Sequence, residues 1–227
     1  YSRPDLPRWN IEGQVSEDGK YLFVVLQDGT APRNELLYSQ LGNPDSPHIG
    51  ARLEPLYTKN DAEYDFVGVE NGTLYLQTTL AAPKDRIVAA RLADPSPAHW
   101  RTVVPEGKGV IAGAAMAGGR IVVQSEIDAT SRLALYTTGG KPLGELSLPT
   151  LGSITELSAR ADSNSIYYGF TSFLYPTRIY RYDVASATTR TVFEPDVKFD
   201  PSEYESRQIF YRSVVAKALE IAARPRA

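Results

Sequence analysis

The chain has 227 residues, of which 42% are hydrophobic, and it carries a formal net charge of −3. This length and apolar content are sufficient for one all-β domain with a sizeable core. The small negative charge gives no electrostatic reason to expect a nucleic acid or an anionic membrane as a partner. The chain contains no cysteine, which excludes disulfides, thiolate nucleophiles and zinc–thiolate sites. We expect no cofactor.

The sequence also gives expectations about membrane insertion and the cellular compartment. No segment has the apolar length needed to cross a bilayer, and the first residues, Tyr1-Ser2-Arg3-Pro4, lack a signal-peptide pattern. We therefore expect a soluble protein. Both the cytoplasm and the periplasm stay open, because a cysteine-free chain is tolerated in a reducing and in an oxidising compartment.

A strand-rich segment recurs four times at intervals of about 45 to 50 residues, a period typical of propeller blades. Each unit has a first apolar strand, a turn with Gly or Asp, a second strand, a third strand rich in Tyr and Leu, and a short fourth strand. Turns such as Glu70-Asn71-Gly72 and Gly118-Gly119 supply the positive φ angles of tight hairpins, so neighbouring strands should be antiparallel. The sequence predicts an all-β fold, a partial β-propeller of about four antiparallel blades.

The predicted strands of the first two units are 11–15, 21–26, 35–41 and 52–57, followed by 64–69, 74–78, 86–92 and 100–104. Those of the last two units are 110–116, 121–125, 132–137 and 143–148, followed by 154–159, 166–170, 178–184 and 189–193. Segment 21–26 is apolar on both faces, as expected for a sheet stacked between two others. Pro176 should end the second strand of unit four, and the Phe and Tyr residues of 170–175 should mostly pack between blades.

Four motifs in this order resemble prolyl oligopeptidase. They are the run Gly13 to Tyr21, the run Glu63 to Val67, Trp100 followed by Val-Val-Pro-Glu at 103–106, and Thr-Ser-Phe-Leu-Tyr-Pro at 171–176 with Ile179-Tyr180. The resemblance runs from about Pro7 to Tyr211. It implies the carboxyl-terminal four blades of a seven-bladed N-terminal propeller. In that family the propeller covers an α/β-hydrolase domain, where Ser, Asp and His cleave short peptides after proline, and it filters substrates by size.

The resemblance divides the chain into three regions. Residues 1–195 are the partial propeller, and 196–211 resemble the linker and first strand that return to the hydrolase domain. Residues 212–227 depart from the family and predict a short C-terminal helix, capped by Ser213 and ended by Pro225. Two origins compete for this tail: a shifted reading frame, which the abrupt departure favours, or a genuine helix that covers a sheet edge.

Catalytic residues are not apparent in the chain. It has no Gly-x-Ser-x-Gly elbow, since Gly152-Ser153 continues without a second Gly. Both histidines, His48 and His99, have turn-rich neighbours typical of surface loops. We expect the chain alone to be inactive. Its expected partners are short proline-containing peptides, the missing hydrolase domain and blades, and a second copy at open blade edges. The alternative is a stand-alone module that binds a peptide or a protein.

If the first strand of each unit is innermost, its polar residues face a central tunnel. This hypothesis gives Glu12, Asp65, Met116 and Glu156 as tunnel-lining candidates. Solvated strand ends explain the glutamates equally well, and gap-filling is the usual role of a buried Met. The spacing of Asp61, Glu63 and Asp65 allows a calcium-assisted hydrolase as a weaker possibility. The stretch lacks the Gly and distal Glu of a calcium loop, so we predict no metal site.

Overall fold

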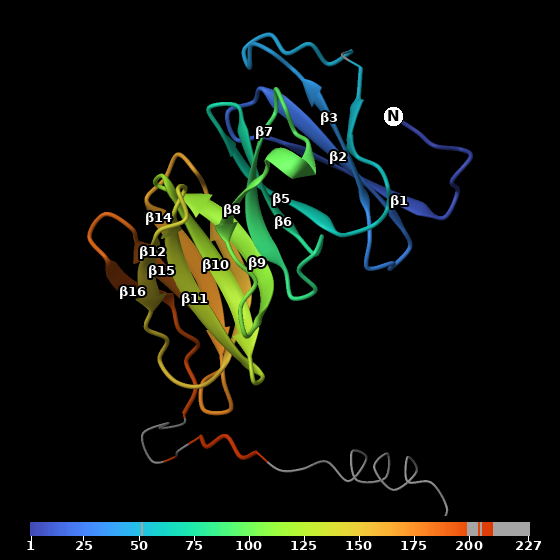
Figure 1. Cartoon of the computed structure of the whole chain (residues 1–227). Coiled ribbons are helices and arrows are strands. Elements are labelled where there is room, and N and C mark those ends of the chain that lie inside the picture. The colour runs from blue at the N-terminus through green and yellow to red at the C-terminus, as the bar shows by residue number, and fades with distance from the viewer. Residues whose placement is uncertain (51, 199–203, 205, 211–227) are drawn as a thin grey trace, which may run out of the picture.

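The computed structural model describes residues 1–50, 52–198, 204 and 206–210, and within them it consists of four separate four-stranded sheets (Figure 1). Every sheet is an antiparallel meander in which strand order follows sequence order. Each sheet is one blade, so the predicted all-β fold of four antiparallel blades is confirmed. The predicted helix at 212–227 lies outside the described residues.

Sixteen strands make up the described blades. Blade 1 contains β1 (Trp9–Val15), β2 (Tyr21–Asp28), β3 (Glu35–Gln40) and β4 (Glu54–Tyr57). Blade 2 contains β5 (Tyr64–Glu70), β6 (Thr73–Thr78), β7 (Arg86–Arg91) and β8 (Arg101–Val104), with the short 3-10 helix η1 (Pro97–His99) before β8. Blade 3 contains β9 (Val110–Ala117), β10 (Arg120–Ile127), β11 (Thr130–Thr137) and β12 (Pro142–Leu146). Blade 4 contains β13 (Ser153–Ala159), β14 (Ser165–Thr171), β15 (Arg178–Asp183) and β16 (Thr188–Phe193).

Tight turns set the register of the inner hairpins. Asn71 and Gly72 join β5 to β6 with φ angles of 50° and 72°, and Gly118 and Gly119 join β9 to β10 with φ angles of 50° and 70°. Two successive positive φ angles give the turn whose twist matches that of the flanking strands. The hairpins therefore form where the sequence predicted them.

The core lies between the sheets rather than inside any one of them. Phe23 of blade 1 is 1% exposed, and its ring centroid lies 4.6 Å from that of Phe66 in blade 2. Corresponding apolar layers join blade 2 to blade 3 and blade 3 to blade 4. Strands with two apolar faces are needed because an interior blade packs against a neighbour on each side.

Buried polar side chains fix the neighbouring blades in register. Asn34 of blade 1 is 2% exposed and exchanges two hydrogen bonds with the backbone of Tyr64 on β5. Gln77 of blade 2 donates to the Ile111 carbonyl on β9, at 3.0 Å. Ser131 Oγ of blade 3 accepts from the Ile154 N–H on β13, at 2.8 Å. Each of the first three blades thus uses an amide or hydroxyl to position the first strand of the next one.

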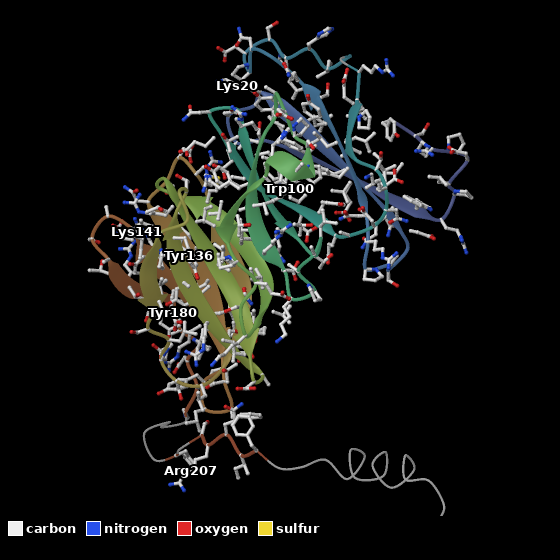
Figure 2. All side chains as sticks on the ribbon, in the orientation of Figure 1. Lys20, Trp100, Tyr136, Lys141, Tyr180 and Arg207 are labelled. Atoms are coloured by element: carbon white, nitrogen blue, oxygen red, sulfur yellow. The ribbon has the colours of Figure 1, made fainter. Side chains whose placement is uncertain are left out.

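An aromatic cluster ties β4 to the segment before β8. The Trp100 indole donates to the Tyr57 hydroxyl and to the Pro95 carbonyl, both at 3.0 Å, and the two rings meet edge to face. Figure 2 labels Trp100 beside η1. The pKa of Tyr57 is raised to about 12 by burial, so this phenol keeps its proton and donates to Pro95 across the physiological range.

The loop from β14 to β15 departs from one prediction. Phe170 is fully buried and packs as expected, and β14 ends before Pro176 as expected. The expectation of packing is wrong for Phe173, which is 100% exposed. Ser172 Oγ accepts hydrogen bonds from the Leu174 and Tyr175 backbone N–H groups, at 3.1 and 3.0 Å. This tight turn places Phe173 at the tip of the loop.

Within the described ranges, no helix has the length and apolar content that a bilayer crossing requires.

Candidate functional site at the axis of the blades

The first strands of the four blades converge on one small cavity of about 150 Å³. Strand β9 lies beside both β5 and β13. The cavity lining comes from all four blades: Gln14, Val15, Glu17, Phe66, Val67, Gly68, Val69, Ala114, Ala115, Met116, Ala159 and Ala161. Because every blade contributes its first strand or the turn after it, this cavity marks the axis around which the blades are arranged.

Small side chains allow the inner strands to approach closely at this point. Alanines line the cavity from β9 and β13, and Gly68 lines it from β5. A Cβ atom on Gly68 would collide with the Met116 side chain, which is 3% exposed. Met116 therefore fills the space that Gly68 leaves open, and the two residues seal the wall between blades 2 and 3.

A hydrogen bond crosses the axis from the first blade to the fourth. The Glu17 carboxylate accepts from the Ala161 backbone N–H at 2.6 Å, between residues 144 positions apart in the chain. The turn that carries Glu17 is held in place by the buried Ser16, which is 3% exposed. Ser16 Oγ donates a hydrogen bond to Asp18 and accepts one from the Tyr21 N–H. A charged acceptor makes this a strong class of hydrogen bond.

Further charges surround this contact. Arg160, next to Ala161, forms a 2.7 Å ion pair with Asp162. The hydrogen bond with Asp162, and then the negative charge of Glu17, raise the pKa of Arg160. The turn ends of blades 1 and 4 therefore carry a network of two carboxylates and one guanidinium where they meet.

The predicted tunnel residues occupy different places. Met116 lines the axial cavity. Asp65 lies half-buried on β5 opposite Gln77, and Glu12 and Glu156 are exposed on β1 and β13. A tunnel-lining role in a larger ring stays a prediction for all four. Sequence reasoning missed Glu17 and Ala161. The available signal was the Ser-Glu-Asp-Gly turn after a predicted first strand, since the turns after the first strands of blades 1 and 4 both reach the cavity.

Asp65 belongs to an acidic group between blades 2 and 3. Its pKa is raised to about 7, first by burial and then by the negative charges of Glu63 and Asp85. Asp85 is 6% exposed, and its Oδ1 atom has no hydrogen-bond partner. Burial is also the main cause that raises the pKa of Asp85, and Glu63 and Glu106 add to it. Ionisation at this seam is therefore costly.

The acidic spacing Asp61, Glu63 and Asp65 does not produce a metal-binding arrangement. Asp61 is exposed and accepts a 2.5 Å hydrogen bond from the Tyr64 hydroxyl. Among the residues that the structure describes, no group of three His, Asp or Glu side chains is arranged to hold a metal ion. Of the three carboxylates only Asp65 lies on β5, because the strand begins at Tyr64, and Asp61 is held by the Tyr64 hydroxyl.

Both histidines lie at the surface, as the sequence predicted. His48 is exposed in the loop between β3 and β4, and His99 is 60% exposed in η1 of blade 2. His99 Nδ1 lies 2.8 Å from Asp94, and this hydrogen bond lowers the pKa of the Asp94 carboxyl. Ser153 begins β13 in blade 4. The described histidines therefore belong to other blades than this serine.

A sequence profile described as "Prolyl oligopeptidase, N-terminal beta-propeller domain" matches residues 1–195. The chain belongs to the prolyl oligopeptidase family. It is 30% identical to the prolyl endopeptidase of Elizabethkingia miricola over 207 residues, which are 91% of this chain and 28% of the relative. The prolyl endopeptidase of Elizabethkingia meningoseptica is 28% identical over the same share of each chain.

Solved structures of the family have the same fold. One from a study of two prolyl endopeptidases superposes with a TM-score of 0.81 at 28% identity, covering 93% of this chain and 30% of that one. Prolyl oligopeptidase B of Galerina marginata superposes with a TM-score of 0.83 at 24% identity. The chain thus spans less than a third of the length of these prolyl oligopeptidases, within their propeller.

Proposed function

We propose that this chain supplies four blades of the propeller through which a prolyl oligopeptidase admits its substrates. The observation that carries the proposal is the axial cavity, which is narrow and is bridged by the Glu17 carboxylate and the Ala161 N–H. The chain would control access to a catalytic centre formed by residues outside it. Its own contribution is selection by size.

The dimensions of the axis support this role. A cavity of about 150 Å³ admits only a few water molecules. A folded 100-residue domain, with a radius of gyration of about 13 Å, is far too large to enter it. An extended peptide is the one class of polypeptide thin enough to pass if the inner strand ends separate slightly. Separation breaks the Glu17–Ala161 hydrogen bond, so this contact opposes opening.

The substrate class comes from the relatives. Prolyl oligopeptidase B of Galerina marginata has been solved bound to a 35mer hydrolysis and macrocyclization substrate. For this chain we propose proline-containing peptides. Cleavage would fall to a serine nucleophile outside these residues, because the sequence contains no Gly-x-Ser-x-Gly elbow. The isolated chain should therefore not hydrolyse a chromogenic peptide ester or amide after proline.

A second role is favoured by the outer strand of blade 4. All six residues of β16 are exposed, and Val192 and Phe193 are 52% and 53% exposed. Open edges and apolar surface of this kind promote association. We propose that the isolated chain self-associates or binds a protein through this region when no further blade covers it.

The gating role can be tested in a chimera of the Elizabethkingia miricola enzyme in which residues 1–195 replace the matching propeller segment. We expect this chimera to cleave a short proline-containing peptide and to spare a folded domain of about 100 residues that carries the same sequence in an exposed loop. Glu17→Ala should raise cleavage of the domain about tenfold relative to the peptide, because a charge-assisted hydrogen bond contributes roughly 1.5 to 3 kcal/mol. The ratio of the two kcat/KM values is the readout.

Glu54→Ala is the matched control, since Glu54 is an exposed carboxylate on the outer strand β4. This variant should leave the ratio unchanged. A Glu17→Ala chimera with the wild-type ratio, or an unmodified chimera that digests both substrates equally, would refute the gating role.

A further inference from the structure

Ile111, on the first strand of blade 3, is bound to blade 2 through both of its backbone groups. Its N–H donates to the Lys84 carbonyl at 3.1 Å, and its carbonyl accepts a 3.0 Å hydrogen bond from the Gln77 side chain on β6. The Ile111 side chain is 5% exposed and belongs to the apolar core between the two blades. We call these two hydrogen bonds the Ile111 joint, because they hold β9 against blade 2.

Two carboxyl groups lie beside the Ile111 joint. Asp65 on β5 is opposite Gln77, and Gln77 is opposite Ile87, a residue of the core between blades 2 and 3. Residues directly opposite each other on neighbouring strands share a face of the sheet, so Asp65 lies on the face toward blade 3. Asp85, directly before β7, also reaches Gln77: burial raises the pKa of its carboxyl, and a hydrogen bond with Gln77 opposes that rise. Both carboxyls therefore adjoin the amide that makes the joint.

The other titratable groups that act on this pair are acidic. After burial, which is the largest cause, the negative charge of Glu63 raises the pKa of both carboxyls, and Glu106 before β9 adds to the effect on Asp85. No basic side chain in the described part of the chain lowers the pKa of Asp65 or of Asp85. Neighbouring carboxyls without a cation do not both ionise readily, and one of them holds a proton instead.

The basic residues nearest in sequence make other contacts. The Lys84 ammonium donates to the Lys108 carbonyl at 2.7 Å, and the Lys84 backbone N–H donates to the Glu106 carboxylate at 2.8 Å. Lys108, in the loop between β8 and β9, is exposed. Arg86 is adjacent to Ile87 on β7 and so lies on the opposite face of blade 2. The carboxyl pair is therefore left without a compensating charge.

The closed joint suits a protonated carboxyl better than an ionised pair. Asp85 is 6% exposed, and its Oδ1 atom has no hydrogen-bond partner in the described part of the chain. An ionised carboxylate only accepts hydrogen bonds, and the Gln77 amide beside it also serves the Ile111 carbonyl. Ionisation of both carboxyls therefore favours contact with water, which reaches them when β9 moves away from blade 2.

We propose that the Ile111 joint is a proton-operated switch: it is closed while the Asp65–Asp85 pair holds a proton and opens when both carboxyls ionise. On opening, the proton passes to water and the hydrogen bonds of the joint break. Opening moves β9 relative to β5, the two strands that carry Met116 and Gly68. Its effect on the axial wall rests on the proposed function, whereas the switch itself does not.

The pH range of the switch follows from the pKa of Asp65, which is about 7 in the closed joint and near the ordinary 3.8 once water reaches the carboxyl. Between these two values the closed joint binds more protons than the open one. The contribution of Asp65 to closure is fully present below about pH 4 and is lost as the pH rises through about 7. The open fraction should therefore rise about tenfold per pH unit over this range and level off above it.

Amide hydrogen exchange of the full chain tests the switch. After correction for the intrinsic pH dependence of exchange, protection of the Ile111 amide should fall about a hundredfold between about pH 5 and pH 7 and change little above that range. Asp65→Asn combined with Asp85→Asn should remove this fall, whereas Asp45→Asn, at an exposed loop position, should keep it. Asparagine retains the size of each side chain, so the double variant should fold.

The Ile154 amide, which donates to Ser131 across the seam between blades 3 and 4, separates local opening from unfolding of the whole chain. Exchange at Ile111 should be faster than at Ile154 and should not respond to low urea concentrations, because a local opening exposes little surface. Equal rates and equal urea dependence at the two amides, or an unchanged pH dependence in the double variant, would overturn the proposal. Opening that depends on pH, together with a gating chimera that digests peptide and domain equally, would refute the proposed function alone.

Discussion

Replacing Asp65 with Asn should stabilise the chain by about 2 to 4 kcal/mol above pH 7 and change its stability little near pH 4. The reason is the raised pKa of the Asp65 carboxyl, about 7 in the folded chain against 3.8 for an ordinary aspartate. Burial between blades 2 and 3 causes most of the rise, and Glu63 and Asp85 add to it. The folded state therefore holds a proton that the unfolded state releases.

The sign of the pH dependence follows from this difference. The pKa is higher in the folded state, so the contribution of Asp65 to stability is fully present below the unfolded value near 4. It is lost as the pH rises through about 7. Asparagine keeps the shape of the side chain and does not ionise. Part of the slope should remain in this variant, because burial also raises the pKa of Asp85.

Urea unfolding of both proteins at intervals between pH 4 and pH 9 measures the effect. Asp45→Asn, at an exposed loop position, serves as control and should follow the wild-type profile. Parallel profiles for wild type and Asp65→Asn would show that Asp65 is solvated rather than buried at the seam.

Truncation of Phe23 to Ala should destabilise the chain by about 3 to 5 kcal/mol, the usual cost of removing a buried aromatic ring. Phe23 is 1% exposed and packs against Phe66 of the next blade and Tyr38 of its own. The cavity would open in the seam between blades 1 and 2. We expect these two blades to lose hydrogen-exchange protection before blades 3 and 4 do, because repeats contact only their neighbours.

Phe173→Ala is the matched control, since the Phe173 side chain is 100% exposed. Its effect on the free energy of unfolding should be within about 0.5 kcal/mol. Urea unfolding of the two variants and of wild type provides the comparison. A cost for Phe23→Ala as small as that for Phe173→Ala would mean that the blades do not stack as described.

Strand periodicity and turn chemistry were sufficient to predict the fold. All sixteen predicted strands are present, and their ends differ from the observed ones by at most two residues. Glycine pairs such as Gly118-Gly119 mark hairpins locally, so no knowledge of tertiary contacts is needed to place them. The exposed Phe173 was missed because its orientation depends on hydrogen bonds to Ser172 within a loop that has no periodicity.

The site was predicted less well, because it is made by residues far apart in sequence. Met116 could be placed near the cavity from its position at the end of a first strand. The contact between Glu17 and Ala161 depends on how four blades are arranged around an axis, and it involves a backbone group that carries no sequence signal. The raised pKa of Asp65 likewise arises from folding: burial at the seam is its main cause, and Glu63 and the loop residue Asp85 add to it.

Cross-linking of the first blade to the fourth tests the central claim most directly, and the lack of cysteine in the chain makes it feasible. Glu17→Cys combined with Ala161→Cys should be joined within one chain by a short bismaleimide. The reaction should be at least tenfold faster than for Glu17→Cys combined with Ser186→Cys, because Ser186 follows β15 in the outer part of blade 4. Mass spectrometry of the digested monomer identifies the linked peptides. Equal rates for the two pairs would contradict convergence of the inner strands on one axis, and with it the gate.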